Sequence, residues 1–387
     1  MSLYFKNSRK EIIFIVLFTF VCTGLLFLPT GFSERLPHGS HFARGLVKSV
    51  DNSHLIQTVV VKAGDQSLEV ELLEGPFKGK VIKVSNLLTG TMEIDEVYSP
   101  GKEILVEYSI INNSPAAAFA RGNYRLRLEL ILVLLFALML LIVGGWTGFK
   151  AILSFVFAVL MIWKVMVPSF LKGWDPIVIG LLVVVAMTAA ICFLVGGLNF
   201  KGLVTFIGTL LGLFLTYVLA NIFTKQFRIH GAVYPFAENL LYSGFDFLNL
   251  TRIFIAGVVI SCSGAVIDLA MDISVSMNEI IKKKPDICLL EHMHSGMAVG
   301  RAAVGSMTTT LLLAYSGSYL ALLMFCMGLG VPVLNMLNKN FVAAEIINTI
   351  VGSFGVVTVA PFTVITGGIL YRLGRKKTAE NPIYTHS

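Results

Sequence analysis

The strongest constraint on the fold is a series of apolar runs, most of them close to 20 residues long. An α-helix needs about 20 predominantly apolar residues to cross the hydrocarbon core of a bilayer. Hydrophobic residues make up 56% of the chain and charged residues only 14%, so we expect an α-helical polytopic membrane protein with about eight transmembrane helices. The expected spans are residues 12–28, 128–143, 151–167, 177–195, 203–223, 251–279, 302–330 and 342–370.

The distribution of charge indicates how these spans are oriented. The net charge is +7, but the basic residues stand at the ends of apolar runs, as the positive-inside rule predicts, and no nucleic-acid site is indicated. Lys282, Lys283 and Lys284 form the strongest marker of the cytoplasmic side. With about eight spans, both termini are then expected in the cytoplasm and the protein in the plasma membrane.

Cysteine and histidine give no sign of a metal site. The five cysteines lie within or beside apolar runs, and none has the paired spacing of a zinc site. His292 and His294 follow Glu291, but this short spacing lacks a third ligand, so we interpret the two histidines as part of a loop. Neither a disulfide framework nor a cofactor is indicated.

Residues 31–123 have the composition of a soluble domain. Turn signals occur at residues 63–65 (Ala-Gly-Asp) and 99–101 (Ser-Pro-Gly). Alternation of apolar and polar residues predicts strands at residues 45–50, 58–61, 67–72, 80–84 and 103–110. Five or six short strands favour a small extracytoplasmic β-barrel-like domain of the OB or SH3-like kind. Two roles stay open for this domain, a docking module outside the cell or a passive spacer.

The chain thus divides into four parts. Residues 1–30 form an N-terminal transmembrane anchor, and residues 31–123 form the β domain. Residues 124–374 form the polytopic membrane domain, and residues 375–387 form a cytoplasmic tail.

One span carries acidic residues. In residues 251–279, Asp268, Asp272, Ser276 and Glu279 are separated by four, four and three positions, so they fall on one stripe of a helix. An ionised carboxylate inside a bilayer costs on the order of 3 kcal/mol or more, and such residues normally face a bundle interior, a cavity or a partner. The alternative is that the helix has already reached the cytoplasmic headgroups at Asp268, where water solvates the charges.

The two following spans carry further polar groups. Residues 315–318 (Tyr-Ser-Gly-Ser) predict an interruption in the middle of the span 302–330, and an interrupted helix exposes backbone groups that need a partner. Thr308 and Thr310 stand one to two turns before the interruption, and Ser316 lies within it. Glu345 begins the last span, where it faces either the bundle or the outer interface with Lys339 as an ion-pair partner.

Two of these segments resemble a known family. The motifs GAVIDLAMDISVSMNEI (residues 264–280) and VGSMTTTLLLAYSGSYLALL (304–323), followed by residues 352–363 with a late proline, are similar to the YibE/F family of bacterial membrane proteins. The resemblance covers residues 128–374, and the anchor with its β domain is like the longer, YibE-like members. It implies the fold, a bacterial cell membrane location and a shorter family paralogue as a partner, and it carries over no functional residue.

These observations favour an ion- or proton-coupled secondary transporter of an unknown small solute. The chain lacks a P-loop, so the energy would come from an ion or proton gradient. Asp268 and Asp272 are the expected proton or cation carriers. The other expected ligands of the ion or solute are Ser276, Thr308, Thr310, Ser316 and Glu345.

Two other functions are weighed against transport. The first is a membrane scaffold whose β domain docks an envelope partner, with no transport. The second is an intramembrane aspartyl enzyme, but this chemistry needs carboxylates from two facing elements, and Asp268 and Asp272 lie one turn apart on a single helix. We therefore expect no enzymatic activity. The expected partners are the lipid bilayer, a small solute or cation, and a second copy of the chain or a shorter paralogue.

Overall fold

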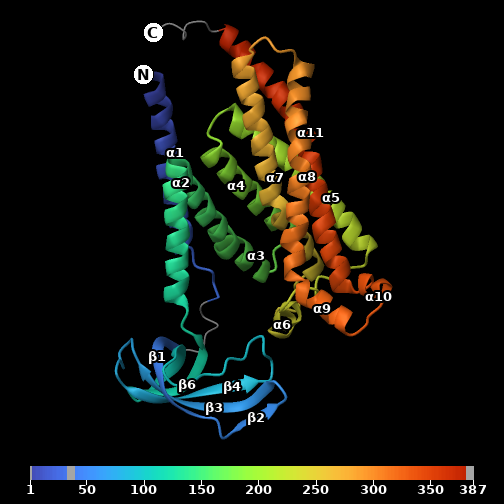
Figure 1. The fold of residues 1–387 in the computed structure, drawn as a ribbon. Coiled ribbons are helices and arrows are strands. Elements are labelled where there is room, and N and C mark those ends of the chain that lie inside the picture. The colour runs from blue at the N-terminus through green and yellow to red at the C-terminus, as the bar shows by residue number, and fades with distance from the viewer. Residues whose placement is uncertain (1, 33–39, 381–387) are drawn as a thin grey trace. The chain divides into compact units, whose positions relative to one another are not determined.

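The computed structural model describes residues 2–32 and 40–380 (Figure 1). The chain forms two compact units, residues 31–139 and residues 1–30 with 140–387. The first holds a β-barrel and the second a bundle of long apolar helices, so the predicted fold class is confirmed.

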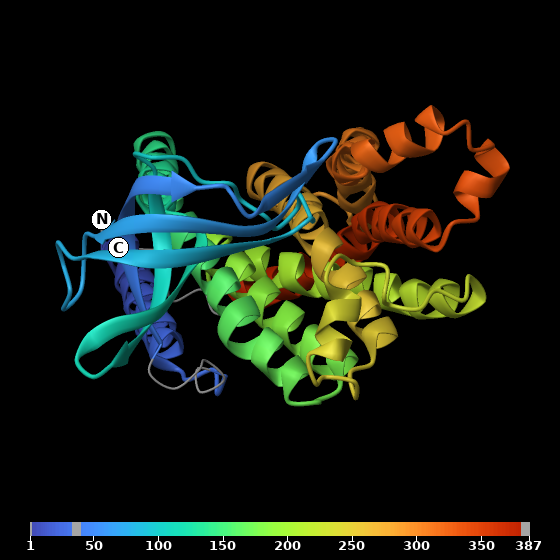
Figure 2. The same ribbon diagram turned by 90° about the horizontal axis from the view of Figure 1, so that it is seen from below.

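The β unit is a closed five-stranded barrel with one additional strand. Its strands are β1 (Ser40–Asp51), β2 (Leu55–Thr58), β3 (Val61–Leu72), β4 (Val81–Thr89), β5 (Glu103–Ile111) and β6 (Ser114–Asn123). They follow the order β1-β5-β6-β4-β3-β2, and a β1–β3 pairing closes the barrel. Strands β3 and β4 run antiparallel side by side (Figure 2), whereas β4 and β6 are parallel. This path through five strands is the arrangement of OB-type barrels.

The alternating pattern correctly located most strands but misplaced one turn. Residues 63–65 lie inside β3. Gly64 has φ +114°, and a Cβ atom on it would lie 2.3 Å from the carbonyl oxygen of His54, so this glycine serves a close approach of two backbones. The predicted strand 58–61 is instead the turn between β2 and β3, with Val59 at φ 57°.

A buried glutamine organises the interior of the barrel. The Gln66 side chain is completely buried, and all of its hydrogen-bonding capacity is used. Its amide nitrogen donates to the Asn52 side chain (2.8 Å) and to the carbonyl oxygen of Tyr98 (3.0 Å). Its carbonyl oxygen accepts from the Asn86 side chain and from the backbone N–H of Tyr98, both at 3.0 Å. A single side chain thus ties β3 to β4 and to the segment before β5.

The helical elements have the following bounds. They are α1 (Ser2–Phe27), α2 (Leu126–Leu160), a π-helix (Met161–Met166), α3 (Val167–Leu171), α4 (Pro176–Val195), α5 (Phe200–Gln226), α6 (Ala237–Tyr242), α7 (Leu250–Lys283), α8 (Leu289–Ser318), α9 (Leu320–Gly328), α10 (Val333–Leu337) and α11 (Asn340–Glu380).

The number of membrane crossings is close to that predicted. Six described helical stretches are long and apolar enough to span a membrane, and α1 has a shorter apolar part, Glu11–Phe27. The stretch Leu126–Leu171 is 46 residues long and is broken at Gly145, whose φ of 52° and ψ of −125° are not helical. A Cβ atom on Gly148 would lie 2.1 Å from the carbonyl oxygen of Leu140, so the chain reverses its direction here. This stretch can therefore hold two of the predicted spans, residues 128–143 and 151–167.

Helix α7 is the centre of the bundle and packs against α4, α5, α8 and α11 (Figure 1). Glycines bring the surrounding helices close together. A Cβ atom on Gly208 of α5 would lie 2.3 Å from the Thr363 hydroxyl of α11, and one on Gly355 of α11 would lie 2.2 Å from the Thr216 hydroxyl of α5. These close contacts follow the small-residue packing of membrane helices.

The predicted interruption in the span 302–330 is present, but it lies at Tyr319, one residue beyond residues 315–318. Residues 315–318 are helical, and α8 runs without a break from Leu289 to Ser318. The hydroxyl of Ser316 donates to the carbonyl oxygen of Leu313 at 3.2 Å, which satisfies it within the helix. Residues 292–301, expected in a loop, form the first half of α8, and the short helices α9 and α10 follow it. The chain breaks at Tyr319, between α8 and α9 and inside the predicted span.

The Gln66 network gives a test of the barrel. Gln66→Leu leaves the polar groups of Asn52, Asn86 and Tyr98 without their partners, and each unsatisfied buried group costs about 1–3 kcal/mol. We expect the free energy of unfolding of a soluble fragment, residues 31–124, to fall by about 3 kcal/mol in urea titration. Gln57→Leu, the same change at an exposed position, should alter it by less than about 0.5 kcal/mol. An equal effect of both changes would contradict the role of Gln66.

Candidate functional site

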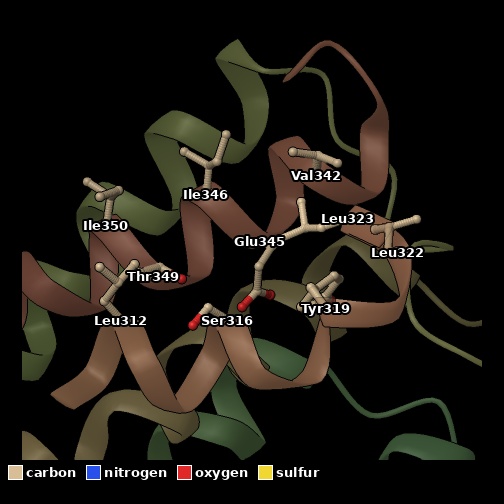
Figure 3. Close-up of a pocket in the computed structure, with 10 residues that line it drawn as sticks. All are labelled: Leu312, Ser316, Tyr319, Leu322, Leu323, Val342, Glu345, Ile346, Thr349 and Ile350. Carbon is tan, nitrogen blue, oxygen red and sulfur yellow. The ribbon is translucent and has the colours of Figure 1, made fainter. Parts of the chain in front are cut away.

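A cavity of about 230 Å³ lies between the C-terminal part of α8, helix α9 and the first turns of α11. Figure 3 shows its walls. Almost all of the exposed lining is apolar, with a single ionisable carboxylate, that of Glu345. The lining residues are Leu312, Ser316, Tyr319, Leu322, Leu323, Val342, Glu345, Ile346, Thr349 and Ile350.

Glu345 projects from α11 into this cavity, and its carboxylate lies between Ser316 and Tyr319 (Figure 3). The Tyr319 hydroxyl and the polar groups of Asn348 and Thr349 lie at the carboxylate. In the part of the chain that the structure describes, no basic residue pairs with Glu345, and the expected ion pair with Lys339 is not formed. The cavity therefore contains a half-buried acid without a protein counter-charge.

Tyrosines surround this acid. Tyr315, Tyr319 and Tyr234 all lie close enough to Glu345 to interact electrostatically with its carboxylate. Tyr234 comes from the aromatic-rich segment between α5 and α7, and its ring lies 5.6 Å from that of Phe254 on α7. Gly257 leaves room for its hydroxyl, which would be 3.3 Å from a Cβ atom at that position. Part of this segment is thus packed on the bundle beside the acid.

A hydrogen bond connects the surroundings of Glu345 to the acidic helix. The Ser261 hydroxyl of α7 donates to the side-chain oxygen of Asn348 on α11 at 2.9 Å. From Ser261, the exposed face of α7 continues through Gly264, Asp268 and Asp272. At a rise of about 1.5 Å per residue, Asp268 lies about 10 Å and Asp272 about 16 Å further along the helix. One face of α7 therefore leads from the cavity region to the two aspartates.

The ends of α7 limit the depth of Asp268. Arg252 pairs with Asp175 at 2.6 Å near one end, and Lys282 pairs with Glu279 at 2.8 Å near the other. Asp268 lies about 24 Å from Arg252 and about 21 Å from Lys282 along the axis. The hydrocarbon core is about 30 Å thick, which is more than the distance between Asp268 and Arg252. If Asp268 lay outside the core on the cytoplasmic side, the core would therefore extend past Arg252 and bury its ion pair. This geometry favours an aspartate within the membrane over one that is solvated at the headgroups.

The structure separates the predicted site residues into groups. Glu345 and Ser316 meet in the cavity, whereas Asp268 and Asp272 lie on the exposed face of α7, with Ser276 half-buried further along. A third group lies along α8: the hydroxyl of Thr308 donates to the carbonyl oxygen of Val304 (2.6 Å), and that of Thr310 to Ser306 (2.9 Å). These two hydroxyls are satisfied within their own helix.

Sequence reasoning missed the residues around the acid. Ser261, Tyr319, Asn348 and Tyr234 come from four separate segments. One local signal was present, because Glu345, Asn348 and Thr349 have the i, i+3, i+4 spacing of a single helix face.

The two histidines have structural surroundings. His292 is buried in the first turn of α8, and its Nε2 lies 2.9 Å from the carbonyl oxygen of Met277 on α7. Its ring lies 6.0 Å from that of Tyr371 on α11. His292 therefore joins α8 to its neighbours at the end of the bundle opposite to Glu345.

Comparison with family models gives two matches. A model described as YibE/F-like protein matches residues 132–373, which hold most of the helical bundle. A model of the YibE/F family N-terminal domain matches residues 47–118, which lie within the β-barrel. Comparison with curated proteins and with solved structures gave no match.

The contact between α7 and α11 gives a test of the site. With Cys262 replaced by serine, a short thiol-specific bifunctional reagent should crosslink the pair Ser261→Cys and Asn348→Cys, because the Oγ of Ser261 lies 2.9 Å from the Oδ1 of Asn348. Mass spectrometry of the crosslinked peptide measures the yield. The control pair is Asp272→Cys with Asn348→Cys. Asp272 lies about 16 Å further along α7 than Ser261, so this pair should not crosslink. Equal yields from both pairs would show that this contact is not present in the membrane.

Proposed function

This chain belongs to the YibE/F-like family of membrane proteins, and we propose that it is an ion- or proton-coupled secondary transporter of a small solute. The observation that carries the proposal is the unpaired carboxylate of Glu345 in a cavity, joined through the Asn348–Ser261 bond to the acidic face of α7. This arrangement supplies three carboxylates that can each bind a proton or a cation.

The energetics of these acids support coupling. An ionised carboxylate inside a bilayer costs on the order of 3 kcal/mol or more, whereas a protonated one, or one that holds a cation, avoids most of this cost. Asp268, Asp272 and Glu345 have no basic partner in the described residues. Each therefore exchanges between a proton and a cation more readily than it stays empty and charged, which is the property that a coupled carrier needs.

We place the protein in the bacterial cell membrane with both termini in the cytoplasm. The support is the basic segment at Lys282, Lys283 and Lys284 between α7 and α8, together with an even number of crossings. In this orientation α8 ends and α11 begins on the outer side, so the Glu345 cavity lies near the outside. The β-barrel, between the first and second crossings, is also outside.

Transport predicts a specific loss of proton movement. The full chain is reconstituted into vesicles that contain a pH-sensitive dye, and proton movement is driven by an imposed membrane potential. Asp268→Asn and Asp272→Asn should each lower the rate to that of protein-free vesicles, because an amide cannot exchange a proton. Glu279→Gln is the matched control, since Glu279 is exposed and paired with Lys282, and should keep the wild-type rate. Undiminished flux in both aspartate variants would remove these carboxylates from the mechanism.

A second candidate function is partner docking, supported by an exposed apolar patch on the barrel. This hairpin patch consists of Ile56, Val59, Val60, Met92 and Ile94, which are between 58% and 85% exposed. Val60 and Met92 also line a small hollow. Val59 holds a left-handed backbone conformation that is rare for a β-branched residue. Exposed apolar patches of this kind mark interaction sites on soluble domains.

Docking predicts the loss of one crosslinked partner. In cells, the substitution Val60→Asp in the hairpin patch should abolish the crosslink between the barrel and its partner, because it places a charge in an apolar interface. Val81→Asp makes the same change at an exposed position at the other end of β4 and should leave the crosslink intact. The crosslinked product is measured by pull-down and mass spectrometry. A crosslink that survives both changes would exclude the hairpin patch as the docking surface.

A further inference from the structure

We propose that the Glu345 cavity binds a small organic cation, in which an ammonium group is attached to an apolar body of about six carbon atoms. This inference rests on the proposed transport function, because it names the class of solute that the protein would carry. It is argued from the charge, the lining and the size of the cavity.

The charge requires a cationic or hydrogen-bond-donating ligand. Glu345 is the carboxylate of the lining, and the described residues provide no ion pair for it. The Ser316 hydroxyl donates to the backbone of its own helix. An anion would meet the carboxylate with no basic residue in the lining to offset the repulsion.

The lining does not suit calcium or magnesium as the preferred ligand. Calcium takes six to eight oxygen ligands and magnesium demands an octahedral set. The cavity offers the Glu345 carboxylate and a few hydroxyls, while six of its ten lining residues are Leu, Ile or Val. An ammonium group needs only one carboxylate and a few acceptors, so it is the cation that this set can hold.

The size sets the length of the apolar body. A volume of about 230 Å³ is that of about seven or eight water molecules in the liquid, at about 30 Å³ each. A linear amine with six carbons has a similar number of heavy atoms. Its chain would contact Leu312, Leu323 and Ile346, and each buried CH₂ contributes about 0.8 kcal/mol, which is about fourfold in affinity.

Aromatic rings complete the site. A cation over the face of a tyrosine within about 6 Å of the ring is attracted by the ring, and clusters of such rings recognise ammonium ligands. Tyr319 lines the cavity, and Tyr315 and Tyr234 lie near the same carboxylate. The combination of one acid, one lining tyrosine and aliphatic walls is the chemistry that recognises an ammonium group with an apolar tail.

Binding is measured by thermal stabilisation and calorimetry on the full chain in lipid nanodiscs. Hexylamine should bind about tenfold or more tightly than hexan-1-ol, because the ammonium group adds an attraction between opposite charges to the hydrogen bond that the alcohol also donates to Glu345. Affinity should rise about fourfold per CH₂ from butylamine to hexylamine. Glu345→Gln should remove the preference for amine over alcohol, and Glu279→Gln should keep it. Ile346→Phe, which fills the cavity but keeps the acid, should weaken hexylamine more than butylamine.

The outcomes separate this inference from the proposed function. Equal binding of hexylamine and hexan-1-ol, or unchanged hexylamine binding in both Glu345→Gln and Ile346→Phe, would overturn the ligand class. Hexylamine binding that depends on Glu345, without proton movement in vesicles, would support the ligand class and overturn transport. Proton movement that depends on Asp268, without hexylamine binding, would leave transport standing and overturn the inference.

Discussion

The membrane domain depends on where its few charges lie relative to the hydrocarbon. The ion pairs described in this unit lie at or beside the ends of apolar stretches. Lys150 pairs with Glu11, Arg252 with Asp175, Lys282 with Glu279 and Lys284 with Glu291. Asp268, Asp272 and Glu345 differ from all of these because no basic side chain among the described residues pairs with them. The paired charges anchor the ends of the helices, and the unpaired ones are available to a proton or a ligand.

The packing of the helices decides which wall of the cavity can move. α7 and α11 are mostly buried, and close contacts at Gly208 and Gly355 hold α11 against α5. α8 has few buried side chains along its apolar stretch, and α9 contributes only one, Cys326. Glu345 is thus fixed on a rigid helix, while the opposite wall of its cavity belongs to loosely packed elements. Opening of the cavity would move α8 and α9 more readily than the acid.

The sequence was sufficient for features that repeat along the chain. Apolar runs located the crossings, and alternation located most strands, because both patterns arise from burial of one side of an element. The errors occur where a residue type is compatible with two different backbone structures. Gly64 suggests a turn, but it allows a close approach of two backbones inside β3. Residues 315–318 suggest an interruption, but they are helical and the chain breaks one residue later, at Tyr319. The cavity itself could not be predicted, since it requires α9 to fold back beside α11.

Glu345 and Asp268 lie at different distances from the ends of their helices, and this difference limits which groups can contact Asp268. Glu345 lies about 8 Å from the start of α11, near enough to the end for a ligand to arrive from water, whereas Asp268 lies near the middle of α7 on an exposed face. Lipid against that face requires a neutral, protonated side chain. A second copy of the chain, packed through the same face, would bring two sets of aspartates together, and like charges also favour protonation. A basic partner helix or a bound cation would hold Asp268 ionised, and the proton is the ligand common to the other two arrangements.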